Sequence, residues 1–280
     1  MYTNQNLEAS QRQKPLQTSV ITLLSDFGDH DVYVGVIKGV IAQINPKLAV
    51  VDLTHQIPPQ NIAAGRFCLM NAYAYFPVGT VHVAVVDPGV GSRRRAIAVE
   101  FAQGFLVGPD NGIFSGVLSQ SPAIAAVELT NLNYWRTPKP SKTFHGRDIF
   151  APVAAHLASG VPFKQLGQEI DPATLVQMNI SSCNQTANGM VGYIQYIDHF
   201  GNLVSNIPGS YVQGKTWYVQ VAGLTIPGCE TYADVEVGEA IALVGSHGWI
   251  EIAINSANAH SQLQINLQDE LLVSQTEINK

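Results

Sequence analysis

The chain has few charged residues and few cysteines, and each shortage excludes classes of protein. Only 13% of its 280 residues are charged, the formal net charge is −6, and Arg93–Arg95 is its one basic run. Nucleic-acid-binding proteins carry a basic face or stripe, so we expect no nucleic-acid partner. The three cysteines, Cys68, Cys183 and Cys229, form no CxxC pair and are odd in number. They indicate no disulfide framework and fit a reducing, cytoplasmic location.

Long apolar runs are also missing. The longest are under about 10 residues, whereas a membrane-spanning helix needs about 20, so we expect no membrane partner. Residues 1–18 are mostly polar and lack the apolar stretch of a signal peptide. We therefore predict that they form a disordered tail and that the protein is cytoplasmic.

From residue 19 to about 180, apolar runs that are typical of buried strands alternate with segments of helical periodicity. Three of these runs end in an acid, at Asp26, Asp52 and Asp87. Strands separated by helices predict a parallel sheet covered by helices, in a Rossmann-like α/β domain over residues 19–180. Ligands bind at the carboxyl ends of the strands in such sheets, which makes the three acids candidate site residues.

The pattern changes after a polar, turn-rich segment, SSCNQTANG. Short strand-like runs follow, separated by turns that contain glycine or asparagine: MVGYIQYID, LVSNI, KTWYVQVAG, AIALVG, WIEIAIN and QLQINL. They predict a small all-β barrel domain over residues 188–272. A ligand site in a cleft between the two predicted domains would be ordinary for an enzyme that acts on a small molecule.

The stretch VVDPGVGSRRR ends a strand at Asp87 and resumes as a strand after three arginines. It matches neither GxxxxGK[ST] nor GxGxxG, and no helix follows it, which argues against a phosphate-binding loop. A carboxylate at the end of a buried strand needs a partner, and the Pro and Gly residues allow an arginine to fold back. The pair can be structural or catalytic. We expect Arg93 and Arg95 to be solvated turn charges.

Two further motifs place polar residues beside predicted helices. In SDFGDHDVYVG, Asp26 follows a strand and suits the two hydroxyls of a ribose, while we expect Asp31 to cap the next helix. In KTFHGRDIFAPVAAH, His145 lies in a turn that can face a cleft, and we expect Asp148 to cap or open the following helix.

In the predicted barrel, YIDHFGNLVSNI places an acid, an aromatic ring and an amide close together. Asp198 suits an ammonium group, Asn202 a carboxylate or amide, and Phe200 an apolar face, as in recognition of an amino acid. The same residues also suit a hairpin turn. In SHGWIEIAIN, Ser246 and Asn255 are candidates to contact a polar ring.

A metal site built from Asp52, His55, Asp87 and His145 is conceivable. Their spacing matches no familiar ligand motif, so we predict no metal.

Seven motifs occur in this order along the chain: SDFGxxDxYVG, DLTHQIPPQNI, VVDPGVGSRRR, GPDNG, FHGRDIFAP, YIDHFGNLVSNI and SHGWIEIAIN. Jointly they resemble the S-adenosylmethionine (SAM) hydroxide adenosyltransferase family, the SAM hydrolases related to fluorinases and chlorinases. The resemblance runs from about Ile21 to Gln268.

The resemblance implies an N-terminal α/β domain and a C-terminal β-barrel domain, assembled as a homotrimer with sites between subunits. It implies hydrolysis of SAM to adenosine and L-methionine, with SAM as substrate and no cofactor. It also assigns the site residues: Asp87, Arg94 and His145 as a catalytic triad, Asp26 at the ribose, Asp198, Phe200, Asn202 and Ser246 at the methionine end, and Asn255 with Ser256 near the adenine.

The chain departs from the halogenases of this family. They carry a tryptophan where Gln60 stands and another where Val204 stands, and their motif is one residue longer between Asp198 and Phe200. A SAM-dependent halogenase is one alternative function. A protein that binds SAM or adenosine without turnover is another.

The candidate triad favours hydrolysis over both alternatives. A carboxylate at Asp87 suits water rather than a halide anion, and a full triad argues for turnover. A sulfonium leaves as a neutral group, so the site has to hold water in line with the ribose C5′. We expect either that His145 accepts the proton of the water or that Arg94 stabilises an attacking hydroxide. Asp87 alone is less suited, because an arginine beside it makes it a weak base.

Overall fold

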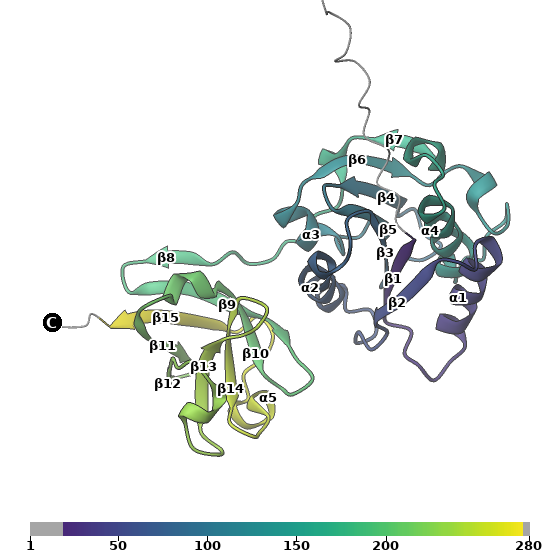
Figure 1. The fold of residues 1–280 in the computed structure, drawn as a ribbon. Coiled ribbons are helices and arrows are strands. Elements are labelled where there is room, and N and C mark those ends of the chain that lie inside the picture. The colour runs from purple at the N-terminus through teal and green to yellow at the C-terminus, as the bar shows by residue number, and fades with distance from the viewer. Residues whose placement is uncertain (1–18, 277–280) are drawn as a thin grey trace, which may run out of the picture. The chain divides into compact units, whose positions relative to one another are not determined.

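The computed structural model describes residues 19–276, and the predicted tail over residues 1–18 lies outside them. The chain divides into two compact units between Met178 and Asn179 (Figure 1). The finer predicted limits, 19–180 and 188–272, stay predictions. Among residues 19–276, none of the helices is long and apolar enough to cross a membrane.

The N-terminal unit is a seven-stranded sheet in the order β2-β1-β3-β5-β4-β6-β7. Its strands are β1 (Val20–Ser25), β2 (Ala49–Thr54), β3 (Thr80–Val85), β4 (Ala96–Phe101), β5 (Gly104–Pro109), β6 (Ala123–Glu128) and β7 (Gln168–Ile170). Its α-helices are α1 (Tyr33–Ile44), α2 (Ile62–Ala72), α3 (Ser115–Gln120) and α4 (Ala151–Ala158), and a π-helical turn, Gly146–Phe150, leads into α4. Short 3₁₀ turns cover Tyr73–Tyr75, Leu132–Tyr134, Phe163–Leu166 and Pro172–Thr174.

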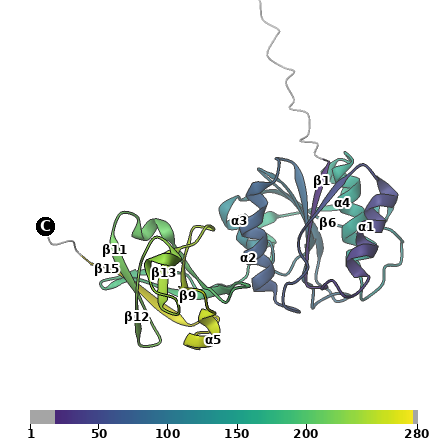
Figure 2. The ribbon, with the colours of Figure 1, turned by 60° about the horizontal axis from the view of Figure 1, so that its bottom comes forward.

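Helices cover both faces of this sheet. Helices α1 and α4 pack together on one face, and α2 and α3 lie on the other (Figure 2). As a result β3 is buried along its whole length, which explains its continuous apolar run. One core cluster joins residues of β1 and β3 to those of α1 and α4. Burial of this apolar surface fixes the carboxyl ends of β1 and β3, after which Asp26 and Asp87 come.

The prediction of a parallel sheet is correct for β2, β1, β3 and β5 and wrong for the rest. Strands β4 and β5 are antiparallel, because the two residues between Phe101 and Gly104 leave no room for a crossover helix. Strand β6 is antiparallel to β4, and β7 to β6. The α/β fold class stands, with a mixed sheet.

The predicted cap of α1 is also wrong. The N-cap residue is Val32, and no side chain caps this end, so Asp31 does not do so. The start of α1 is held instead by ring contacts of Tyr33 with Phe27 and Phe144, at centroid distances of 5.9 and 5.2 Å.

The C-terminal unit is a nearly closed antiparallel barrel, which confirms the predicted all-β class. Its strands are β8 (Asn184–Thr186), β9 (Gly189–Ile197), β10 (Leu203–Pro208), β11 (Thr216–Val221), β12 (Leu224–Pro227), β13 (Ala240–Val244), β14 (Trp249–Ile254) and β15 (Glu270–Thr276). They run in the order β12-β11-β15-β9-β10-β14-β13, and β8 pairs with β9. A bridge between Gly228 and Ala242 links the two end strands. Short 3₁₀ turns cover Gly209–Val212 and Tyr232–Asp234.

The predicted strand QLQINL is wrong. Its first residues end helix α5 (Ala259–Leu263), which Asn258 caps by accepting a hydrogen bond from the Ser261 amide. Gln264 then turns the chain with a φ of 56°, and Ile265 enters the barrel core. Alternating apolar residues reach the core here from a helix end and a loop, which periodicity alone does not distinguish from a strand.

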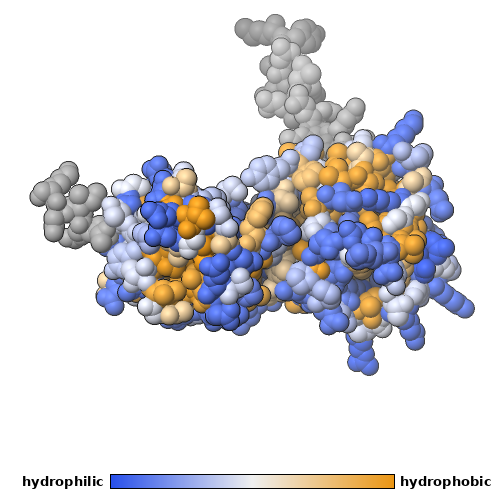
Figure 3. Space-filling view, turned by 90° about the horizontal axis from the view of Figure 1, so that it is seen from below, coloured by the Kyte–Doolittle hydropathy of each residue, from blue (hydrophilic) through white to orange (hydrophobic). Residues whose placement is uncertain are grey.

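The surface keeps apolar side chains in patches among hydrophilic ones, as Figure 3 shows for one face. Large apolar residues with more than two thirds of their surface exposed include Val32, Tyr75, Phe200 and Val237. Apolar atoms make up much of the surface of most folded proteins, so single exposed residues of this kind need no special explanation.

We predict that Gly108→Ala destabilises the N-terminal unit. A Cβ at Gly108 would collide with the Ala84 carbonyl oxygen across the β3–β5 pair and lie 2.9 Å from Phe114 Cζ. Overpacking of this kind costs about 1–3 kcal/mol of unfolding free energy, so thermal unfolding should begin several degrees lower.

The matched control is Gly39→Ala in α1, where nothing lies within 4 Å of the added carbon. There alanine should be neutral or stabilise by up to about 1 kcal/mol. Equal midpoints for the two variants by calorimetry would contradict the packing described for β3 and β5.

Candidate active site

A cavity of about 170 Å³ lies at the carboxyl ends of β1 and β3, and Asp26, Gln60, Asp87, Phe144 and His145 are among the residues that line it. The two acids meet there because β1 and β3 are parallel neighbours that pair up to Ser25 and Val85. Two of the three candidate acids at strand ends, Asp26 and Asp87, therefore line one cavity. Asp52 belongs to a separate cluster.

Arg94 joins Asp87 to His145. Its Nε donates hydrogen bonds to Asp87 Oδ1 and Oδ2 at 2.9 and 3.1 Å, and its Nη2 also donates to Oδ2. The same Nη2 lies 2.8 Å from His145 Nδ1. The side chains of Asp87 and Arg94 are only 6% and 10% exposed. The guanidinium also lies over the ring of Phe150, 5.3 Å from its centroid. Arg94 thus directly contacts both other residues of the predicted triad.

A glycine allows the two loops of this site to meet. Gly91 has a φ of +76°, and a Cβ there would collide with the carbonyl oxygen of Lys142, three residues before His145. Only glycine allows both this backbone conformation and this close approach. The loop after Asp87 therefore folds back, as the sequence predicts, and brings Arg94 against the loop that carries His145.

Burial and the contact with Arg94 together determine the protonation state of His145. A guanidinium has donors and no acceptor, so Nδ1 has to accept the hydrogen bond and the neutral ring carries its hydrogen on Nε2. Burial and the charge of Arg94 lower the pKa of His145 from 6.5, against the opposing effect of Asp87 and Asp148. His145 is a neutral ring whose one acceptor nitrogen is occupied.

The loop at the end of β2 supports Asp26. The Gln60 amide donates to Asp26 Oδ2 at 2.8 Å, and Gln60 itself has a φ of 64°. The Gly28 amide donates to the His55 carbonyl at 2.8 Å, and Ser25 Oγ lies 2.7 Å from His55 Nδ1. The loop thus holds the residues on both sides of Asp26, Ser25 through its side chain and Gly28 through its backbone amide. A carboxylate accepts several hydrogen bonds, so Asp26 retains capacity for ligand hydroxyls.

The four residues considered for a metal site fall into two clusters. Asp52 pairs with Lys38 at 2.5 Å and lies 3.1 Å from His55, whereas Asp87 and His145 share Arg94. Among residues 19–276, no three histidine, cysteine, aspartate or glutamate side chains are grouped so as to hold a metal ion.

The arginines beside Arg94 differ from each other. Arg93 is exposed, as expected for a solvated turn charge. The same prediction for Arg95 is wrong, because its Nε donates to Asp110 Oδ2 at 2.8 Å and its Nη1 to Thr174 Oγ1 at 3.0 Å. Asp110 is buried at the end of β5, next to the start of β4, and needs a partner.

In the C-terminal unit, a cavity of about 490 Å³ is lined by Phe200, Asn202, Tyr232 and Ser256, among others. Asp198 lies beside it and shapes the turn between β9 and β10. Its Oδ1 accepts from the amides of Phe200 and Asn202, and its Oδ2 from Asn202 Nδ2 at 3.1 Å. The hairpin-turn hypothesis is therefore correct for Asp198, and the same turn presents Phe200 and Asn202 to the cavity.

The remaining predicted binding residues lie near the ends of β13 and β14. Ser256 Oγ donates to Asn255 Oδ1 at 3.0 Å, and Asn255 Nδ2 donates to the Val235 carbonyl at 2.9 Å. These bonds fix the turn that brings Ser256 to the cavity. Ser246 is exposed and is not among the residues that line it.

Tyr232 lines the same cavity and was missed by the sequence analysis. Its hydroxyl donates to the buried Glu251 at 2.5 Å, and burial with this bond and nearby Asp198 raises its pKa. The signal that points to its turn is a capping box, Thr231-x-x-Asp234, whose two reciprocal bonds are both formed.

Comparison with known families and proteins adds to this geometry. Residues 21–167 match the family described as "SAM hydroxide adenosyltransferase N-terminal domain", and residues 192–272 match its C-terminal domain. A protein named "(R)-S-adenosyl-L-methionine hydrolase" from Salinispora tropica is 39% identical over 258 residues, 92% of this chain and 98% of that protein. One of the same name from Thermus thermophilus is 38% identical over 87% of this chain and 94% of that protein.

The fold is matched by a crystal structure of an uncharacterized conserved protein from Thermotoga maritima, with a TM-score of 0.85 and 33% identity over 91% of this chain and 99% of that one. A fluorinase from an Actinoplanes species is a more distant relative, 27% identical over 85% of this chain and 91% of that protein.

The contact between Arg94 and His145 can be tested by ¹⁵N NMR of the imidazole. We predict that the ring is neutral with its hydrogen on Nε2, and that it titrates below 6.5. Arg94→Gln removes a positive charge that lowers this pKa, so His145 should titrate at higher pH in that variant.

Arg93→Gln is the control, since it removes an exposed charge from the same loop and should leave the titration unchanged. A ring with its hydrogen on Nδ1, or a wild-type pKa above 6.5, would contradict the described hydrogen bond.

Proposed function

The chain belongs to the SAM hydroxide adenosyltransferase family, and we propose that the cavity at Asp26, Asp87 and His145 is where it carries out the family's reaction. It is an enzyme that hydrolyses SAM to adenosine and L-methionine. The observation that carries the proposed site is the contact of one guanidinium with both Asp87 and His145 at the edge of that cavity.

The reaction needs a positioned water more than an acid. Water oxygen attacks the ribose C5′ while the C5′–S bond breaks, and the electron pair of that bond goes to sulfur. The sulfonium becomes the neutral thioether of methionine, so the leaving group needs no proton. Holding water about 3–3.5 Å from C5′, on the side opposite sulfur, removes much of the entropic part of the barrier.

In this proposal His145 and Asp87 hold the water from two sides. The neutral His145 can donate from Nε2 to the water oxygen, because its Nδ1 is committed to Arg94. Asp87 is left as the acceptor, since a carboxylate offers more acceptor positions than its bonds to Arg94 occupy. The geometry thus favours Asp87, rather than His145, as the group that accepts the proton. The sequence alone favours His145 or a hydroxide stabilised by Arg94.

A weak base is sufficient for this step. As the C–O bond forms, the attacking oxygen becomes a strongly acidic oxonium, and even an ion-paired carboxylate can accept its proton. Arg94 stabilises the change in charge that accompanies this proton transfer, and it keeps the side chains of Asp87 and His145 in position.

The other substrate contacts are proposed from the resemblance. Asp26 accepts the ribose hydroxyls. Asp198, Phe200, Asn202 and Ser246 bind the methionine end, and Asn255 with Ser256 lies near the adenine. Phe200, Asn202 and Ser256 support this assignment by lining one cavity. Carboxylates at Asp26 and Asp198 also favour approach of a cationic substrate.

The enzyme is a homotrimer with sites assembled between subunits, it is cytoplasmic, and it uses no cofactor. The trimer is inferred from the family resemblance alone. A cytoplasmic location is supported by the small number of cysteines, three in 280 residues, which form no CxxC pair.

A halogenase is disfavoured. A carboxylate at Asp87, in the wall of the cavity, would repel a halide ion where it has to attack. Gln60, at the position of a halogenase tryptophan, uses its backbone amide to hold Asp26.

We predict that Asp87→Ala and His145→Ala each lower kcat for SAM hydrolysis by at least about 100-fold, because each removes one side of the water site. SAM should bind each variant within a few-fold of the wild-type Kd, as measured by calorimetry. Arg93→Ala, an exposed residue of the same loop, is the matched control and should retain full turnover.

The same assay separates the alternatives. Release of 5′-halo-adenosine in chloride or fluoride would show a halogenase, and bound SAM without methionine release would show a binding protein. Wild-type turnover in both alanine variants would refute the assignment of the triad.

The pH dependence of kcat has a predicted sign. The neutral form of His145 is the active one, and its pKa is lowered below 6.5 by burial and by Arg94. The rate should therefore be level above that pKa and fall as the pH drops through it, since a protonated ring can no longer accept from Arg94. A rate that already declines with a midpoint above 6.5 in steady-state assays would contradict this state of the ring.

A further inference from the structure

We propose that Asp148 is a positioning residue that holds the loop of residues 136–145 and thereby places His145 against Arg94. The inference rests on the proposed role of His145 and goes beyond it, because Asp148 does not line the cavity and acts through another side chain. The sequence predicts that Asp148 caps or opens the following helix. Asp148 lies in the first turn of the π-helical segment, whose N-cap residue is His145, and no side chain caps this end.

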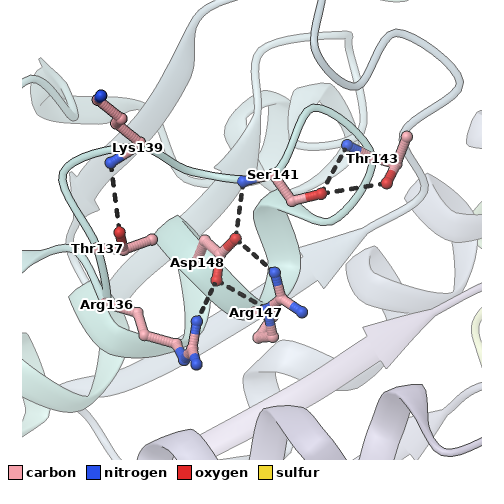
Figure 4. Close-up of polar contacts among 7 residues, drawn as sticks. All are labelled: Arg136, Thr137, Lys139, Ser141, Thr143, Arg147 and Asp148. Carbon is pink, nitrogen blue, oxygen red and sulfur yellow. Dashed lines mark hydrogen bonds and ion pairs between the residues drawn. The ribbon is translucent and has the colours of Figure 1, made fainter.

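The Asp148 carboxylate binds three separate parts of the chain, as Figure 4 shows. Its Oδ1 accepts from Arg136 Nη1 at 3.2 Å and from Arg147 Nε at 2.8 Å. Its Oδ2 accepts from Arg147 Nη2 and from the Ser141 amide, both at 2.8 Å. The carboxylate therefore cross-links the start of the loop, its middle and the π-helical turn after it.

The backbone of Asp148 completes the closure. Its carbonyl accepts from the Arg136 amide at 3.0 Å, and its amide donates to the Phe144 carbonyl at 3.2 Å. Both ends of the loop are thus fixed to one residue. Its last residues, Thr143, Phe144 and His145, all line the cavity.

The middle of the loop is fixed as well. Ser141 Oγ accepts from the Thr143 amide at 3.3 Å, next to the backbone bond that Ser141 makes with Asp148 (Figure 4). Lys142 packs its carbonyl against Gly91, in the loop that carries Arg94. A shift of this segment would therefore move His145 and open its contact with Arg94.

The burial of Asp148 makes this arrangement rigid. The side chain is 1% exposed, while Arg136 and Arg147 cover it and remain 46% and 31% exposed. Burial alone would raise the pKa of Asp148, but the hydrogen bonds from Arg147, Ser141 and Arg136 lower it to about 2. The group stays ionised, and a buried carboxylate cannot release these donors without a large cost.

Asp148→Asn tests the inference, since it keeps the size of the side chain but cannot accept from all of these donors. We expect kcat to fall at least about 10-fold with the KM for SAM within about threefold, because a displaced His145 affects the reacting water more than substrate binding. The ¹⁵N signals of the His145 ring should also lose the pure Nε2–H pattern.

Val99→Ala is the control for lost stability alone. It truncates a fully buried residue of β4 away from the loop and should lower the unfolding midpoint while leaving kcat and the His145 signals unchanged. If Asp148→Asn does not fold, Arg147→Gln and Arg136→Gln remove two bonds and one bond from the same carboxylate and should shift the same readouts by less.

The inference is overturned if the folded variants resemble Val99→Ala in both kcat and ring signals. The ring signals need no turnover. A failure of the proposed function, in which the wild type does not hydrolyse SAM, is therefore distinguishable from a failure of this positioning role.

Discussion

One guanidinium group holds the proposed active site together. Arg94 is bound to Asp87, which follows β3, and to His145, which begins the turn into α4, so it joins two loops that the sheet alone would leave separate. Its own position depends on burial, on the ring of Phe150 and on a glycine turn that brings the loops into contact. An arginine suits this place because it remains charged when buried and has a rigid, forked set of donors.

The same interaction divides the chemical roles between the two partners. His145 has one acceptor nitrogen and gives it to Arg94, so the ring is left as a donor. Asp87 has acceptor positions to spare and can receive the proton that water loses. A sulfonium leaves as a neutral thioether without receiving a proton. An oriented water and one weak proton acceptor are therefore sufficient, and the proposed mechanism uses no metal or cofactor.

Part of this could be predicted from the sequence. The acids at strand ends, the returning arginine and the change to a barrel all follow from local patterns, and the joint order of seven motifs led to the family. Arg95 was misjudged because its partner, Asp110, is determined by tertiary contacts. The bonds of Asp148 to Ser141 and Arg136 could not be predicted for the same reason. Tyr232 was missed for the same reason, since only the tertiary fold places it in the wall of a cavity. Strand β4 turned antiparallel because of a two-residue connection, and the motif QLQINL shows that periodicity cannot separate a helix end from a strand.

The central claim is that water attacks C5′ of SAM in the cavity beside Arg94. Turnover in ¹⁸O-labelled water, followed by mass spectrometry of both products, tests this most directly. The account predicts one ¹⁸O atom in adenosine, at its 5′ oxygen, and none in methionine. Unlabelled adenosine, or label in the amino-acid product, would contradict it.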